Sequence, residues 1–119
     1  MNLKVTERVV DGVAVVDCSG RLIFGEEAAA LRDLVKDLML RGHRRILLNL
    51  EGVTYIDSGG LGALVGLFTS ARAVGGEIKL LHLTRRVNEL LQVTKLLTVF
   101  EAYDSEEQAV RSFGKSTAA

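Results

Sequence analysis

The residues best suited to chemistry in this sequence form one short segment, Asp57-Ser58-Gly59-Gly60-Leu61-Gly62. Ser58 stands where a helical pattern begins, and the glycines after it permit a sharp turn and the close approach of another molecule. The first amides of a helix lack internal partners and attract anions. A phosphate on Ser58 would therefore be stabilised locally, by free amides near Gly60 and Leu61, and the Ser58 hydroxyl is expected to be exposed to an incoming kinase.

Two other interpretations of the same segment stay open on local grounds. Asp57 and Ser58 are common helix caps, and glycines often shape tight turns, so the segment is also compatible with a purely structural role. Asp57 accordingly either orients Ser58 and contacts a partner, or serves as a cap. A nucleotide-binding loop is disfavoured, because the spacing of Gly59, Gly60 and Gly62 matches neither the dinucleotide fingerprint nor the P-loop.

An enzyme would need a base within reach of the Ser58 hydroxyl. Neither His43 nor His82 is expected in the same strand-end loop, so we predict no catalytic residue. The two histidines and Cys18 show no metal-ligand spacing. We therefore expect neither a metal site nor a cofactor.

The composition limits the class of protein. The chain has 119 residues, 48% of them hydrophobic and 25% charged, which suits one domain with a substantial core. The 15 basic and 15 acidic residues cancel, which argues against direct nucleic-acid binding. Cys18 is the single cysteine, the alternating and charged residues 1–10 are not expected to act as a signal peptide, and the apolar runs are too short to cross a bilayer. These features predict a cytoplasmic protein that does not insert into membranes.

Strands and helices alternate in the hydrophobic pattern. Asp11-Gly12 separates two β-rich runs and predicts a hairpin. The other expected elements are a helix over 26–41, a buried strand over 46–50, a loop over 51–57, a helix over 58–74, a strand over 77–83, a helix capped by Thr84, a short strand over 99–101 and a helix from Asp104 or Ser105 to Phe113.

This order predicts an α/β fold with a mixed, mostly parallel sheet of four to five strands, about four helices and an N-terminal β-hairpin. We expect the helices mainly on one face and Ser58 at the exposed start of the second helix. One domain is expected over 1–113, followed by a flexible tail over 114–119.

The hexapeptide 57–62 resembles the STAS domain family, specifically the bacterial anti-sigma factor antagonists. Their pattern is Asp-Ser-Ser/Thr/Ala-Gly-Leu-Gly after a short hydrophobic strand, here Ile46-Leu47-Leu48-Asn49-Leu50, and before a helix that ends at Gly75-Gly76. The similarity extends from the opening hairpin to the last helix.

The resemblance implies a partner-switching cycle in a non-enzymatic phosphoprotein that regulates transcription. The unphosphorylated antagonist binds an anti-sigma factor, itself a serine kinase, and so releases a sigma factor. The kinase then phosphorylates Ser58, the complex dissociates, and a serine phosphatase resets the protein. The partner-binding residues implied are Asp57, Ser58, Gly59, Gly60, Leu61 and Gly62.

Two departures from the family pattern concern the choice of partner. Gly59 replaces the usual Ser or Thr, which leaves Ser58 as the only hydroxyl in the motif and is expected to loosen the helix start. Gly20-Arg21-Leu22-Ile23 stands where members often have Gly-Glu-Leu-Asp, so negative charge is lost and positive charge gained. Arg85-Arg86 is a candidate border of the same face. The alternative function is a non-switching STAS scaffold in a signalling or lipid-transport assembly.

Overall fold

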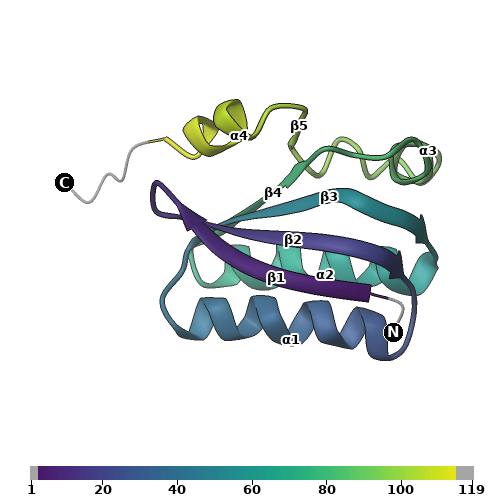
Figure 1. Ribbon diagram of the computed structural model, residues 1–119, viewed down its shortest axis with the longest axis horizontal. Coiled ribbons are helices and arrows are strands. Elements are labelled where there is room, and N and C mark those ends of the chain that lie inside the picture. Colours follow the sequence, from purple (N-terminus) through teal and green to yellow (C-terminus); the bar gives the residue numbers. More distant parts are fainter. Residues whose placement is uncertain (1–2, 115–119) are drawn as a thin grey trace.

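In the computed structural model, residues 3–114 are described, and they fold into a five-stranded sheet with four helices (Figure 1). The strands are β1 (Leu3–Val10), β2 (Val13–Leu22), β3 (Arg45–Ile56), β4 (Glu77–Leu81) and β5 (Ala102–Tyr103). The helices are α1 (Glu26–Leu40), α2 (Ser58–Ala73), α3 (Arg85–Val93) and α4 (Glu106–Ser112). The strands are ordered β1-β2-β3-β4-β5, with β1 antiparallel to β2 and the others parallel. The predicted fold class is confirmed.

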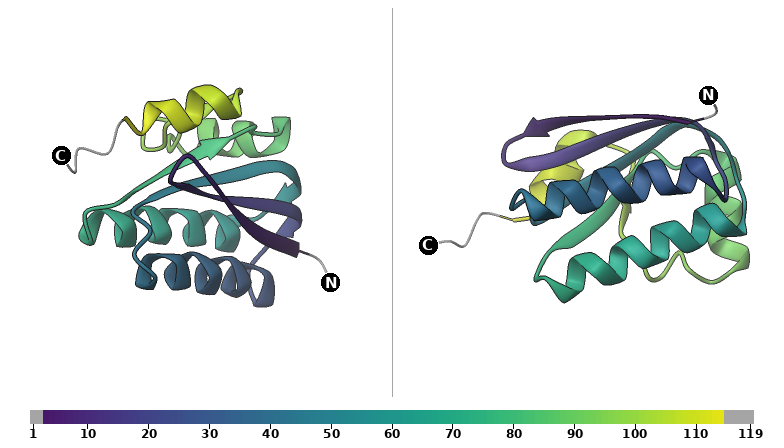
Figure 2. Two further views of the ribbon diagram at one scale, coloured as in Figure 1. Left: turned by 60° about the vertical axis from the view of Figure 1, so that its left-hand side comes forward. Right: turned by 90° about the horizontal axis from the view of Figure 1, so that it is seen from below.

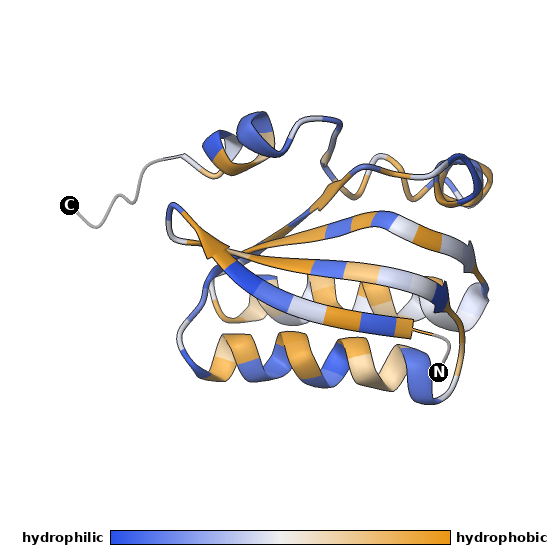
Figure 3. Ribbon diagram, in the orientation of Figure 1, coloured by the Kyte–Doolittle hydropathy of each residue, from blue (hydrophilic) through white to orange (hydrophobic). Residues whose placement is uncertain are grey.

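The opening hairpin forms as predicted. Asp11 and Gly12 both have positive φ, 50° and 81°, and Val10 pairs with Val13 across the turn. Positive φ at both central residues matches the right-handed twist of the strands, which explains why Asp-Gly is favoured there. Hydrophilic residues interrupt the hydrophobic ones along β1, the outer strand of the sheet (Figure 3). Such residues discourage further strand pairing at an exposed edge.

Helices cover the two faces of the sheet unequally. α1 and α2 lie side by side across one face, and α4 lies on the other (Figures 1 and 2). The first face holds the larger core, and its fully buried large side chains include Leu31, Leu38, Ile56 and Leu64. Against α4 pack Val13, Val15, Leu47 and Leu81, among others. The expectation of helices mainly on one face therefore describes α1 and α2, whereas α4 forms a smaller second layer.

The loop predicted over 51–57 is wrong, because β3 continues to Ile56. Its second half pairs with the end of β2, where Gly20 lies opposite Val53 and Leu22 opposite Ile56. The register shifts twice along this stretch, and such bulges disturb the alternation by which a strand is recognised. Gly52 fits the irregular pairing, since a Cβ there would lie 2.9 Å from the Cys18 carbonyl oxygen.

The bounds of two further strands differ from the predictions. β4 ends at Leu81 rather than at residue 83, because His82 adopts φ 57° and leaves the strand. The last strand is Ala102–Tyr103 rather than 99–101. β4 pairs only with the first half of β3, and α3 contacts β3 instead of extending the sheet. Of the predicted tail over 114–119, residues 115–119 lie outside the described part of the chain.

Candidate functional site

The candidate site lies at the end of the sheet where β2 and β3 terminate side by side. Leu22 and Ile56 form the last residue pair of these strands, and the Asp57 amide donates a hydrogen bond to the Leu22 carbonyl oxygen at 3.3 Å. The chain then turns directly into α2, whose first residue is Ser58. Ser58 is exposed, and its hydroxyl has no hydrogen-bond partner within residues 3–114. The predicted position of Ser58 is confirmed.

Asp57 fixes this turn. Its Oδ1 accepts a hydrogen bond from the Gly60 amide at 2.8 Å, which is the N-cap of α2. The same carboxylate accepts the Phe24 amide, at 3.1 Å to Oδ1 and 3.2 Å to Oδ2, and so joins the β2–α1 loop to α2. The Gly60 bond, followed by the Phe24 bond, lowers the pKa of Asp57 from its ordinary value. The capping role of Asp57 is therefore shown, and its carboxylate is a negative charge beside Ser58.

The amides available to an anion differ from those predicted. The Gly60 amide is taken by the Asp57 side chain, and the Leu61 amide donates to the Asp57 carbonyl oxygen at 2.9 Å. The Gly59 amide also acts on the Asp57 carboxylate, as one of the backbone hydrogen-bond donors that lower its pKa, and only the Ser58 amide of this turn has no hydrogen-bond partner in residues 3–114. The expectation of a phosphate bound near Gly60 and Leu61 is thus corrected, because Asp57 already occupies that end of the helix.

Glycine is required at two of the three motif positions. A Cβ on Gly60 would lie 2.1 Å from the Leu22 carbonyl oxygen, and one on Gly59 would lie 2.5 Å from the Phe24 Cβ. A Cβ on Gly62 would meet nothing within 4 Å. Gly59 thus allows the β2–α1 loop to pass directly over the first turn of α2, which explains its presence in place of a hydroxyl residue.

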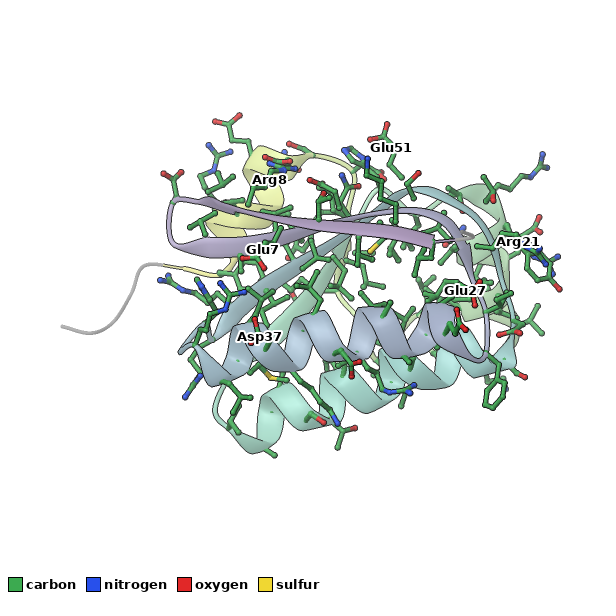
Figure 4. The ribbon with its side chains drawn as sticks, turned by 60° about the horizontal axis from the view of Figure 1, so that its bottom comes forward. Glu7, Arg8, Arg21, Glu27, Asp37 and Glu51 are labelled. Atoms are coloured by element: carbon green, nitrogen blue, oxygen red, sulfur yellow. The ribbon has the colours of Figure 1, made fainter. Side chains whose placement is uncertain are left out.

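Aromatic and basic side chains surround this turn. Phe24 is 80% exposed. Tyr55 is 38% exposed, and the guanidinium groups of Arg21 and Arg86 both lie over its ring, with Cζ atoms 5.8 and 4.6 Å from the ring centroid. Arg21 extends from the end of the molecule where β2 stops (Figure 4). Three elements, β2, β3 and α3, therefore supply this group of side chains.

Phe24 and Tyr55 were not predicted as site residues. Strand order could have identified them, because the loops that follow neighbouring parallel strands meet at one edge of the sheet. Phe24 follows β2 and Tyr55 is the penultimate residue of β3, so knowledge of the β2–β3 pairing would have placed both near Ser58.

The other candidate residues lie away from this site. Burial raises the pKa of Cys18 to about 12, so its thiol stays protonated. His43 follows α1, and His82 follows β4. Residues 3–114 contain no group of three or more His, Cys, Asp or Glu arranged for a metal ion. Within the same range no helix combines the length and apolar character needed to cross a membrane.

Comparison with known proteins assigns the family. A model of the STAS domain matches residues 4–109. The chain belongs to the STAS domain family. Two relatives of this STAS domain span nearly its whole length. The TM1081 homologue of Thermotoga neapolitana is 35% identical over 104 residues, covering 87% of this chain and 91% of that protein. The anti-sigma F factor antagonist of Paenibacillus polymyxa is 27% identical over 110 residues, covering 92% and 94%.

Solved structures share the STAS fold. The anti-sigma factor antagonist SpoIIAA in its unphosphorylated form matches with a TM-score of 0.76 and 22% identity, covering 93% of this chain and 95% of that one. The phosphorylated form of SpoIIAA from Bacillus matches with a TM-score of 0.71 and 21% identity, covering 93% and 98%. At this identity the likeness concerns the fold alone.

Proposed function

We propose that this STAS domain is a cytoplasmic anti-sigma factor antagonist switched by phosphorylation at Ser58. In this proposal the unphosphorylated protein binds an anti-sigma factor that is also a serine kinase, which frees a sigma factor. The contact surface includes the exposed Ser58 and Gly62 and the partly exposed Asp57 and Gly59, whereas Gly60 and Leu61, also predicted to bind the partner, are buried and support the turn from below. No direct contact with nucleic acid is proposed. Phosphorylation ends the complex, and a serine phosphatase restores the binding form. The domain, taken as residues 1–113, has no catalytic role of its own.

The single observation that carries this proposal is the exposed, unpartnered hydroxyl of Ser58 on a rigid turn. Asp57 and the close packing of Gly60 against Leu22 hold the turn in place, while the hydroxyl itself is committed to no internal bond. A kinase can therefore reach the hydroxyl without unfolding α2. Relatives named as anti-sigma factor antagonists support the antagonist part of this assignment.

The electrostatics of the turn supply the switching step. Phosphorylation adds roughly −1.5 to −2 charges at neutral pH. The Asp57 carboxylate already occupies the start of α2, so the new charge stands beside an existing one instead of filling an empty anion site. An interface formed around a neutral hydroxyl would have to desolvate both charges, which is costly. Release of the partner then follows without a change of fold.

The direct test is phosphorylation by the partner kinase, isolated by pull-down with the unmodified protein as bait. With ATP, intact mass should show one added phosphate, and peptide mapping should place it on Ser58. Ser58→Ala should gain none, whereas Thr54→Ala, which removes an exposed hydroxyl four residues earlier, should be modified normally. Modification that persists in Ser58→Ala, or none in the wild type, would move the protein to the non-switching scaffold class.

Binding provides a second test of the same proposal. Ser58→Glu should weaken the kinase complex by about tenfold or more, because it brings a carboxylate into the interface. Ser58→Ala adds neither bulk nor charge and should bind as the wild type does. Calorimetric titration of the three proteins distinguishes these outcomes, and equal affinities would argue against an interface at Ser58.

A further inference from the structure

Arg21, Tyr55 and Arg86, which we name the arginine–tyrosine cluster, bring two cationic side chains to one aromatic ring. Each guanidinium lies over the same Tyr55 ring, at 5.8 Å for Arg21 and 4.6 Å for Arg86. Stacking on an aromatic ring holds a guanidinium in place while leaving its N–H edge free for other contacts. The cluster thus presents two like charges in a fixed arrangement.

Neither guanidinium forms an ion pair with a carboxylate in residues 3–114. The seven ion pairs of residues 3–114 involve Arg8, Arg41, Lys79, Arg85 and Arg111, but not Arg21 or Arg86. The adjacent Arg85 is paired with Glu89 at 3.6 Å, so the same helix turn contains one compensated and one uncompensated arginine. Two like charges held close together without a carboxylate form a positive patch that favours an anionic ligand.

The fold holds this patch next to the candidate switch. Arg21 and Tyr55 are partners in the β2–β3 register, and the following pair, Leu22 and Ile56, leads directly to Asp57 and Ser58. The Thr84 hydroxyl accepts the Val87 amide at 3.3 Å and so caps α3, which carries Arg86. The cluster is therefore placed by two strands and a capped helix rather than by a mobile loop.

We propose that the arginine–tyrosine cluster binds carboxylates on the anti-sigma factor and selects a partner that is acidic at this contact. This inference rests on the proposed function and specifies the charge of its partner. Each guanidinium edge offers paired N–H donors that match a carboxylate. Protein carboxylates are favoured over a nucleic-acid backbone, because the chain has 15 basic and 15 acidic residues and only this small patch is uncompensated near the site.

The first experiment does not depend on the kinase. The ¹⁵N-labelled protein is titrated with hexaglutamate at low salt and followed by NMR of the arginine Nε–H groups and the Tyr55 ring. Shifts should concentrate at Arg21, Arg86 and Tyr55, and should disappear in the Arg21→Gln/Arg86→Gln double variant and in high salt. Arg72 is the internal control, because it lies over the Phe68 ring at 5.7 Å, about 20 Å along α2 from Ser58. Equal shifts at Arg72, no shift at the cluster, or a stronger response to duplex DNA than to hexaglutamate would overturn the inference.

The second experiment uses the kinase complex. Arg21→Glu and Arg86→Glu should each weaken binding by about tenfold and reduce its salt dependence, whereas Arg72→Glu should bind as the wild type does. Unchanged or tighter binding in both cluster variants would overturn the inference even if Ser58 is phosphorylated normally. Loss of phosphorylation in Ser58→Ala tests the proposed function separately, so the two failures are distinguishable. Thermal unfolding of each variant confirms that the fold is retained.

Discussion

Arginines in two regions of the molecule differ in whether they have a carboxylate partner. On the face that carries α4, the Arg8 guanidinium of β1 donates two hydrogen bonds to Asp17, at 2.7 and 3.0 Å, and two to Glu106, at 3.0 and 2.7 Å. The Asn49 side-chain amide also donates to Asp17, at 2.8 Å. At the strand ends near Ser58, Arg21 and Arg86 lie over Tyr55 with no carboxylate partner in residues 3–114. Figure 4 shows Arg8 and Arg21 on distant parts of the molecule.

The difference separates charges that maintain the fold from charges that are available to a partner. The Arg8 bonds connect β1, β2 and α4 and lower the pKa values of Asp17 and Glu106. Near Ser58 the backbone is held by the Asp57 hydrogen bonds and by the close packing at Gly59 and Gly60, while Arg21 and Arg86 lie over Tyr55 without a carboxylate partner. A rigid backbone with uncommitted side chains is preorganised for binding, because little order is lost when a complex forms. Four measurements test this contrast.

The largest effect is expected at the close approach of α2 to β2. Gly60→Ala places a Cβ 2.1 Å from the Leu22 carbonyl oxygen, a backbone atom that cannot turn away. We expect a loss of about 3 kcal/mol in the free energy of unfolding. Gly62→Ala, on the same helix with open space around it, should instead gain about 0.5–1 kcal/mol. Urea denaturation of both variants provides the measurement, and similar values for the two would contradict the packing described at Gly60.

The next largest effect on the free energy of unfolding is expected from the Asp57 cap of α2. Asp57→Ala removes the acceptor for both the Gly60 and Phe24 amides and should cost about 2 kcal/mol. Ser105→Ala is the matched control, because Ser105 caps α4 through the Gln108 amide alone and should cost about 1 kcal/mol. Thermal or urea unfolding compares the two. A smaller loss for Asp57→Ala than for Ser105→Ala would show that the turn at Ser58 is not rigidly held.

The difference between Arg8 and Arg21 predicts unequal changes in the free energy of unfolding for the same substitution at the two positions. Arg8→Gln should lower the free energy of unfolding by about 1 kcal/mol, a modest value because the side chain is 40% exposed. Arg21→Gln should change stability by less than about 0.5 kcal/mol. Urea denaturation measures both values. If Arg21→Gln lowers the free energy of unfolding as much as Arg8→Gln does, then Arg21 stabilises the fold and is not a charge left available to a partner.

The smallest effect is a pH dependence. Hydrogen bonds from Arg8 hold the pKa values of Asp17 and Glu106 below their ordinary 3.8 and 4.5. A lowered folded-state pKa contributes stability that is present above the ordinary value and is lost as pH falls through the folded-state value. The difference between wild type and Arg8→Gln should therefore be constant near pH 6 and shrink from about pH 4.5 downward. Denaturation curves between pH 6 and 3 measure it, and a difference that grows on acidification would refute the assignment.

Much of the fold is determined locally and was predicted. The Asp11-Gly12 hairpin, the apolar stripe of α1 and the Thr84 cap depend on residues close together in sequence. The position of Ser58 at the start of α2 has the same origin, because Asp57 and the helical pattern after it define a helix N-terminus.

Other features were decided only by tertiary structure. The extension of β3 to Ile56 depends on pairing with β2 across two register shifts, an interaction between segments more than 30 residues apart. The requirement for Gly59 arises from Phe24 in another loop, and the Tyr55 stack joins Arg21 and Arg86 from different elements. Sequence alone thus located the exposed hydroxyl of Ser58, since a helix start is a local property. The surface around it was established only by the packing that brings β2, β3 and α3 together, because distances between remote residues are not encoded in local patterns.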